Sequence, residues 1–178
     1  TGVLDPGGYN MPLTAYQPLF QVWREGGLTV RVAYSLCAPR RDHELEDFQT
    51  HTALLPMGAG DDWLRFNGIG ERLTFGMYNN DKPDAADIAA FEDIAHWAAR
   101  SGLAMSVHWN NQRSIGPLLD VFERVGRKFD LAPLRWSVAH IHDAEPETLA
   151  RLHQSGLGWL TQNAPYFAAP AFIRSMSA

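Results

Sequence analysis

Short apolar runs alternate with amphipathic segments along most of the chain. Residues 28–36 (LTVRVAYSL) form a nine-residue run rich in β-branched and aromatic side chains. Two glycines precede this run, so the pattern predicts a turn followed by a strand. Shorter apolar runs predict four more strands, at residues 63–66, 103–109, 135–142 and 157–162, and a further strand is expected around residue 3.

Helical periodicity fills the intervals between these runs. Residues 84–100 place their apolar side chains on one stripe, begin after a proline and end before a glycine, as helices commonly do. Residues 115–126 repeat apolar positions at intervals of three and four. A third helix is predicted from Pro146 to Gly156, with proline at its first position. Two earlier helices are expected at residues 13–25 and 40–54.

The spacing of the strands predicts the fold class. The strand centres, taken near residues 3, 30, 64, 105, 138 and 159, are separated by 27, 34, 41, 33 and 21 residues. Each interval is long enough for a crossover helix, which parallel neighbours require. We therefore predict an α/β fold with about six parallel βα units. Because a closed (β/α)8 barrel needs eight units, the elements alone fit either an open doubly wound sheet or a partial TIM-type barrel.

Composition narrows the class of protein. The 178 residues are 46% apolar and 20% charged, which is typical of one soluble globular domain, expected here over residues 1–178. A net charge of −5 without a basic run argues against nucleic acid as a partner. Neither a membrane-spanning run nor a secretory signal is found, so we expect a cytoplasmic protein without a membrane partner. The lone Cys37 cannot form an intrachain disulfide, and core packing is its favoured role.

Histidines close two successive predicted strands. His108 lies at the end of one, and His140 and His142 lie at the end of the next. In α/β folds, side chains at the carboxyl ends of neighbouring strands converge above the sheet, and imidazole is the commonest metal ligand in proteins. The spacing therefore suggests a metal site at His108 and His140. A hydrogen-bonded structural role is the more frequent one for a lone strand-end histidine.

Two stretches resemble amidohydrolase family 3. SVHWNNQRSIGPLLDVFERV (106–125) is similar to its fifth-strand segment, V-H-A-x-G-D-x-A-I followed by a helix, and WSVAHIHDAEPETLARLHQSGLGWLTQ (136–162) is similar to its sixth and seventh strands, I-E-H-A-Q and S-x-Q-P. The resemblance extends more weakly to LTVRVAYSL and TGVLDPGGY as the third strand and the end of the second. It implies a single-domain fragment comprising strands two to seven of a TIM-type barrel, and a chain that begins with Thr1 fits that interpretation.

The resemblance also implies a site. His108 and His140 correspond to the metal-ligating histidines of the fifth and sixth strands. His142 stands at the family's Gln as an extra imidazole, Arg113 at its Arg and Gln162 at its seventh-strand Gln. These last three are expected to contact substrate or to support the ligands. The implied cofactor is a divalent metal, expected to be zinc, and the implied reaction is hydrolysis of a C–N bond in a small amide-type substrate.

Three positions depart from the family pattern. Gln112 replaces an Asp, Ala139 replaces a Glu, and Arg65 aligns with a fourth-strand lysine that is carbamylated in some members and bridges two metals. An arginine stays protonated, so it cannot form a carbamate and is expected to place a fixed positive charge in the site. The first-strand H-x-H and the eighth-strand general-base Asp are expected outside this chain. We therefore expect the chain alone to be inactive and to bind metal weakly. A catalytically degenerate, barrel-derived binding domain is the alternative.

A sheet of six parallel strands would leave two edges unpaired. Those edges are predicted near Val3 and Trp159. Unpaired edges with apolar side chains are a liability that proteins relieve by pairing or covering them. We therefore expect the chain to associate with itself.

Overall fold

The computed structural model of the protein describes residues 1–8, 12–162, 167 and 169–176. Its strands are β1 (Gly2–Asp5), β2 (Arg31–Leu36), β3 (Leu64–Glu71), β4 (Met105–Trp109), β5 (Ser137–His140) and β6 (Gly158–Leu160). They form one sheet in the order β1-β2-β3-β4-β5-β6, and every neighbouring pair is parallel. The predicted α/β fold with six parallel strands is therefore confirmed. The doubly wound alternative is wrong, because it requires a reversal of strand order that this sheet lacks.

Helices occupy the crossovers between these strands, and one further helix, α7, follows β6. They are η1 (Leu13–Tyr16), α1 (Gln17–Arg24), α2 (Glu44–Thr52), α3 (Ala85–Arg100), η2 (Gln112–Ser114), α4 (Gly116–Gly126), η3 (Ala132–Leu134), α5 (Pro146–Gln154) and α7 (Ala169–Met176). The helix predicted at 13–25 begins as a 3-10 turn, and the helix predicted at 40–54 is shorter at both ends. No helix in the described ranges has the length and apolar character needed to cross a membrane.

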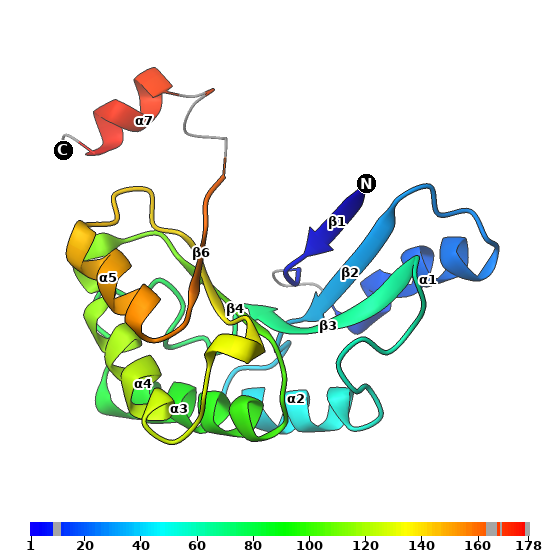
Figure 1. Cartoon of the computed structure of the whole chain (residues 1–178), viewed down its shortest axis with the longest axis horizontal. Helices are drawn as coiled ribbons and strands as arrows, with labels where there is room; N and C mark the ends of the chain where they lie inside the picture. The colour runs from blue at the N-terminus through cyan, green and yellow to red at the C-terminus, as the bar shows by residue number, and fades with distance from the viewer. Residues whose placement is uncertain (9–11, 163–166, 168, 177–178) are drawn as a thin grey trace.

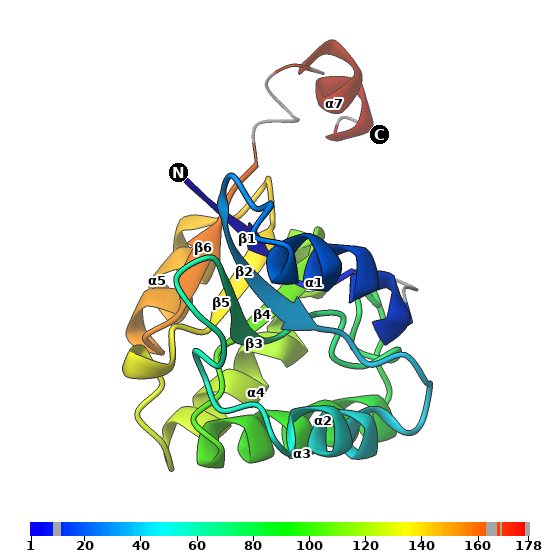
Figure 2. The same cartoon turned by 90° about the vertical axis from the view of Figure 1, so that its right-hand side faces the viewer.

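Helices α2, α3 and α4 cover one face of the curled sheet (Figures 1 and 2). Alternate residues of the central strands, such as Val107 and Val138, are buried toward this helical layer. Phe122 of α4 packs against Trp136, with ring centroids 6.0 Å apart. The indole of Trp136 donates a hydrogen bond to the carbonyl oxygen of Leu103 at 2.8 Å. Burial of these large side chains holds the helices against β4 and β5.

The other face of the sheet carries several small polar side chains on its central strands. A cavity of about 650 Å³ on this side is lined in part by Asn67, Ser106 and Ser137. Leu4 of β1 and Leu160 of β6 line the same cavity, although they belong to the two opposite edges of the sheet. The sheet is therefore curled far enough for its edge strands to face a common interior.

Strand β3 is longer than predicted. The apolar run indicated a strand over 63–66, whereas β3 continues through Gly68 and Gly70 to Glu71. The two glycines have φ values of +106° and +153°. A Cβ atom at either glycine would lie 2.1 Å or 2.4 Å from a backbone oxygen of the adjacent segment 104–106. The glycines are therefore explained by close approach of two strands, and they do not mark a turn.

Candidate metal centre

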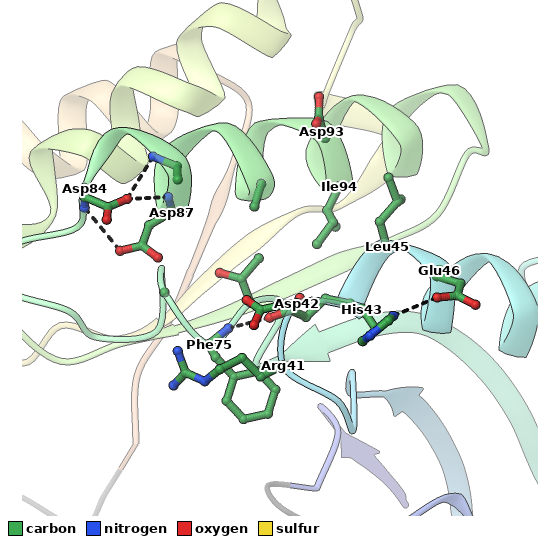
Figure 3. Close-up of a pocket in the computed structure, with 15 residues that line it drawn as sticks. Arg41, Asp42, His43, Leu45, Glu46, Phe75, Asp84, Asp87, Asp93 and Ile94 are labelled. Carbon is green, nitrogen blue, oxygen red and sulfur yellow. Dashed lines mark hydrogen bonds and ion pairs between the residues drawn. The ribbon is translucent and has the colours of Figure 1, made fainter.

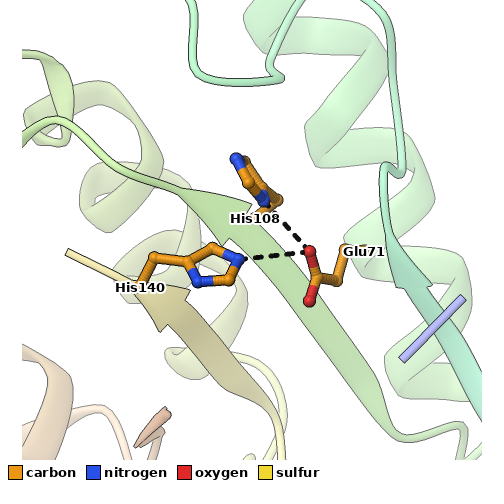
Figure 4. A group of neighbouring side chains, drawn as sticks. All are labelled: Glu71, His108 and His140. Atoms are coloured by element: carbon orange, nitrogen blue, oxygen red, sulfur yellow. Dashed lines mark hydrogen bonds and ion pairs between the residues drawn. The ribbon is translucent and has the colours of Figure 1, made fainter. Parts of the chain in front are cut away.

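Three side chains meet at the carboxyl ends of β3, β4 and β5 (Figure 4). Oε2 of Glu71 lies 3.0 Å from Nδ1 of His108 and 3.4 Å from Nε2 of His140. The two imidazole centroids are 4.4 Å apart. One ligand atom from each of the three residues lies within 4.8 Å of the other two. The structure thus brings together the two histidines singled out in the sequence and adds a carboxylate.

The backbone at the end of β5 directs His140 toward this cluster. In the parallel register, Ala139 lies opposite His108, and His140 lies opposite Trp109. Simple alternation would therefore place His140 on the face opposite to that of His108. His140 instead adopts a φ of 80°, so the strand ends in a turn that brings its imidazole beside that of His108. The indole Nε1 of Trp159 donates to the carbonyl oxygen of His140 at 3.0 Å and holds this turn.

Sequence reasoning missed Glu71. The apolar run predicts a strand that stops at residue 66, and the family resemblance assigns the site position on this strand to Arg65. In the structure Arg65 is exposed near the start of β3, and Glu71 at its end faces the histidines. The interpretation that Arg65 places a fixed positive charge in the site was wrong. The signal in the sequence was the stretch Gly68-Ile69-Gly70-Glu71, which directly follows the predicted strand and ends in a carboxylate. In the structure this stretch continues β3.

Side-chain amides lie against the outer nitrogens of both imidazoles. The amide nitrogen of Asn110 is 3.0 Å from Nε2 of His108. The amide nitrogen of Gln162 is 2.6 Å from Nδ1 of His140 and 3.4 Å from Nε2 of His142. Burial lowers the pKa of His142, and the neighbouring imidazole of His140 lowers it further. Gln162 and His142 therefore lie beside a candidate ligand.

Two other positions from the resemblance have different surroundings. Arg113 is exposed on η2 and contributes no ligand atom to the group formed by Glu71, His108 and His140. Gln112 donates a hydrogen bond to the Thr148 hydroxyl at 2.9 Å and accepts one from the backbone N–H of Glu145 at 3.2 Å. Gln112, which replaces the family's Asp, therefore ties η2 to the start of α5.

Cys37 and Asp5 serve the packing of the strand ends. The Cys37 thiol is buried and donates to the carbonyl oxygen of Gly70 at 2.8 Å, and burial raises its pKa. Asp5 accepts hydrogen bonds from the Tyr16 hydroxyl at 2.8 Å and from the backbone N–H of Gly7 at 3.0 Å. Burial raises the pKa of Tyr16, and the hydrogen bond to Asp5 raises it further. Packing is thus the role that these contacts support for Cys37.

A separate cavity of about 550 Å³ lies between the start of α2, the N-terminal part of α3 and residues 74–76 (Figure 3). Its wall is rich in carboxylates, and several of them have local structural roles. Asp84 and Asp87 form the capping box of α3. Glu46 lies 2.9 Å from Nδ1 of His43. The converging histidines on the sheet are therefore the stronger candidate for chemistry.

Comparisons with known proteins relate the chain to others by fold. No protein-family model matches the chain, and no curated protein matches its sequence. Among solved structures, an uncharacterized metal-dependent hydrolase from Pyrococcus horikoshii OT3 is similar, with a TM-score of 0.57 and 18% sequence identity. The alignment covers 89% of this chain and 32% of that hydrolase. The chain therefore shares the fold of about a third of that protein, and membership of amidohydrolase family 3 stays a prediction.

Proposed function

We propose that this chain is the central part of a TIM-type barrel and carries the core of a metal centre in an amidohydrolase that cleaves C–N bonds. One observation carries the proposal: a carboxylate and two imidazoles converge at the carboxyl ends of three consecutive parallel strands. Barrel enzymes carry their active sites at this end of the strands. Support also comes from the fold similarity to a protein described as a metal-dependent hydrolase.

The three donors fit a divalent metal, and zinc in particular. Catalytic zinc sites commonly use three ligands drawn from histidine and glutamate, with a fourth position open to water. Glu71 would contribute Oε2, His108 would contribute Nδ1 and His140 would contribute Nε2, since these atoms already face one another. When bound, a divalent ion supplies Lewis acidity and a more acidic water molecule.

The residues of this chain would hold the metal, and we assign proton transfer to a group outside the chain. Glu71 provides negative charge beside the two histidines, and its side chain is only 10% exposed. The general-base Asp and two further histidines implied by the resemblance would complete the centre. The earlier expectation of weak metal binding counted two ligands, whereas the structure offers three. We therefore expect measurable zinc binding by this chain and hydrolysis only by the intact protein.

Hydrolysis by the intact protein tests the proposal. Release of amine from a panel of N-acyl compounds should require a divalent metal, stop on chelation and resume when zinc is restored. The His140→Ala variant should show neither metal retention nor turnover. An intact protein that holds zinc but cleaves none of these amides would contradict the enzymatic proposal and favour the alternative of a degenerate binding domain.

We also propose that the chain associates with itself through its open sheet edges. Val3 and Leu4 of β1 are 50% and 48% exposed, and Trp159 and Leu160 of β6 are 40% and 38% exposed. Each edge strand also has one side without a paired neighbour in the described sheet. Unpaired backbone groups beside exposed apolar side chains favour pairing with another chain.

Light scattering tests this association. We expect this chain to form dimers or larger species as its concentration rises. Leu4→Lys and Leu160→Lys should shift the population toward monomer, because a charge at a sheet edge opposes pairing. Leu54→Lys is the matched control, since Leu54 is 92% exposed and lies outside the strands. A monomer at every concentration, or equal effects of all three variants, would contradict the proposal.

A further inference from the structure

Each of the two histidines lies between a carboxylate and an amide. His108 faces Oε2 of Glu71 through Nδ1 and the amide nitrogen of Asn110 through Nε2, both at 3.0 Å. His140 faces the same carboxylate through Nε2 at 3.4 Å and the amide nitrogen of Gln162 through Nδ1 at 2.6 Å. In both rings, the inner nitrogen faces the candidate metal position and the outer nitrogen faces an amide.

This arrangement specifies where each ring carries its proton in the metal-free protein. A neutral imidazole has one N–H donor and one lone-pair acceptor, and an ionised carboxylate only accepts. The inner nitrogens of His108 and His140 therefore carry the protons and donate to Glu71. The outer nitrogens accept from the NH₂ groups of Asn110 and Gln162.

Metal ligation requires the opposite placement. A ligating nitrogen must present its lone pair, so each proton must move to the outer nitrogen, which then needs an acceptor. A side-chain amide supplies that acceptor after a half turn, because its oxygen replaces its nitrogen at the same place. Asn110 and Gln162 are both exposed, which leaves their amide groups room to turn. The backbone N–H of Asn110 is held by the side-chain oxygen of Asn79 at 2.7 Å, so the residue itself stays in place.

We infer that Asn110 and Gln162 are positioning residues that set the protonated nitrogen of His108 and His140, donating in the metal-free protein and accepting when a metal is bound. The inference rests on the proposed metal centre and deepens it. Partners of this kind on the outer nitrogens of metal-binding histidines typically alter metal affinity about 10- to 100-fold.

His142 fits the same arrangement without acting as a ligand. Its Nε2 lies 3.4 Å from the amide nitrogen of Gln162, which also contacts His140. The NH₂ group has two protons and can donate to both rings at once. A half turn of the Gln162 amide group would present its oxygen to the imidazoles of both His140 and His142. His142 therefore stabilises whichever orientation Gln162 adopts.

Nuclear magnetic resonance of the histidine ring nitrogens tests the inference without any metal. At pH 8, long-range ¹H–¹⁵N correlations of the metal-free protein should show protonated Nδ1 on His108 and protonated Nε2 on His140. Addition of zinc should exchange the protonated and unprotonated nitrogens on both rings. In metal-free Asn110→Asp, which presents only acceptors, Nε2 of His108 should carry a proton. The opposite pattern in the metal-free wild type would overturn the inference.

Zinc affinity, measured by calorimetry, provides the second readout. Asn110→Ala and Gln162→Ala should each weaken binding about 10- to 100-fold. Asn110→Asp and Gln162→Glu, which keep an acceptor, should restore wild-type affinity or exceed it. Gln112→Glu is the matched control, because it adds the same negative charge two residues after Asn110. The Gln112 side chain contacts Thr148.

The two readouts separate this inference from the proposed function. Alanine variants that bind zinc as tightly as wild type would overturn the positioning role and leave the metal centre standing. If Gln112→Glu gains as much zinc affinity as Asn110→Asp, the effect comes from the added charge alone. That result would also overturn the positioning role. A wild-type protein that binds no zinc would contradict the metal centre, while the metal-free ring-nitrogen pattern would still report on the amides.

Discussion

Zinc binding by this chain is expected to fall about 100-fold or more in the Glu71→Gln variant. The substitution keeps the shape of the side chain but removes the negative charge and one strong donor from a cluster of three. A full structural zinc site supplies roughly 10–16 kcal/mol from four ligands, so the loss of one ligand corresponds to several kcal/mol. Isothermal titration calorimetry with zinc at neutral pH measures the change directly.

Two controls make that experiment specific. Glu147→Gln removes the same charge from an exposed position in the first turn of α5 and should leave zinc affinity unchanged. Arg65→Ala tests the interpretation that the structure corrects: an arginine in the site would repel the cation, and its removal would then strengthen binding. We expect no change, because Arg65 is exposed near the start of β3. Wild-type affinity in Glu71→Gln would contradict the assigned donor.

The second large effect is expected for Gly70→Ala. An added Cβ would lie 2.4 Å from the carbonyl oxygen of Ser106 and 2.9 Å from that of Pro6, and the φ of +153° is one that residues with side chains rarely adopt. The backbone of β3 would have to move away from β4. We expect a loss of about 2–4 kcal/mol in the free energy of unfolding, measured by urea denaturation.

The same substitution should also weaken zinc binding, because Gly70 directly precedes Glu71. Gly102→Ala is the matched control: its φ is +66°, but nothing lies within 4 Å of the added Cβ. It should cost only the left-handed strain of about 1–2 kcal/mol and leave zinc affinity intact. Equal losses of stability and affinity in the two variants would show that strand contact at Gly70 is unimportant.

Local patterns predicted most of the secondary structure. Helix α3 starts where Asp84 caps it and ends before Gly102, because capping and left-handed glycine chemistry depend on residues a few positions apart. The strand around Val138 was predicted from its apolar run, and the helix that begins at Pro146 from proline at its first position. Both signals are also local. The parallel pairing of the strands followed from crossover length, which is also a local property, whereas their sequential order was implied only by the family resemblance.

The candidate site could be predicted only in part. His108 and His140 were identified because they close consecutive apolar runs, and parallel neighbours bring their carboxyl ends together. Glu71 was missed because the apolar run ends at residue 66, and the strand continues through Gly68 and Gly70 only because the neighbouring strand approaches closely there. The resemblance indicated Gln162 as a residue expected to contact substrate or support the ligands, whereas nothing in the sequence indicated that Asn110 contacts His108.

The sequence by itself thus determined the βα rhythm, the parallel pairing of the strands and two of the three candidate ligands. Hydrophobic periodicity and helix capping encode such features over short stretches of chain. Only the tertiary structure decided that β3 extends to Glu71 and that the left-handed turn at His140 brings its ring beside that of His108. These features depend on backbone atoms of neighbouring strands, which come within a few ångströms only after the sheet has formed.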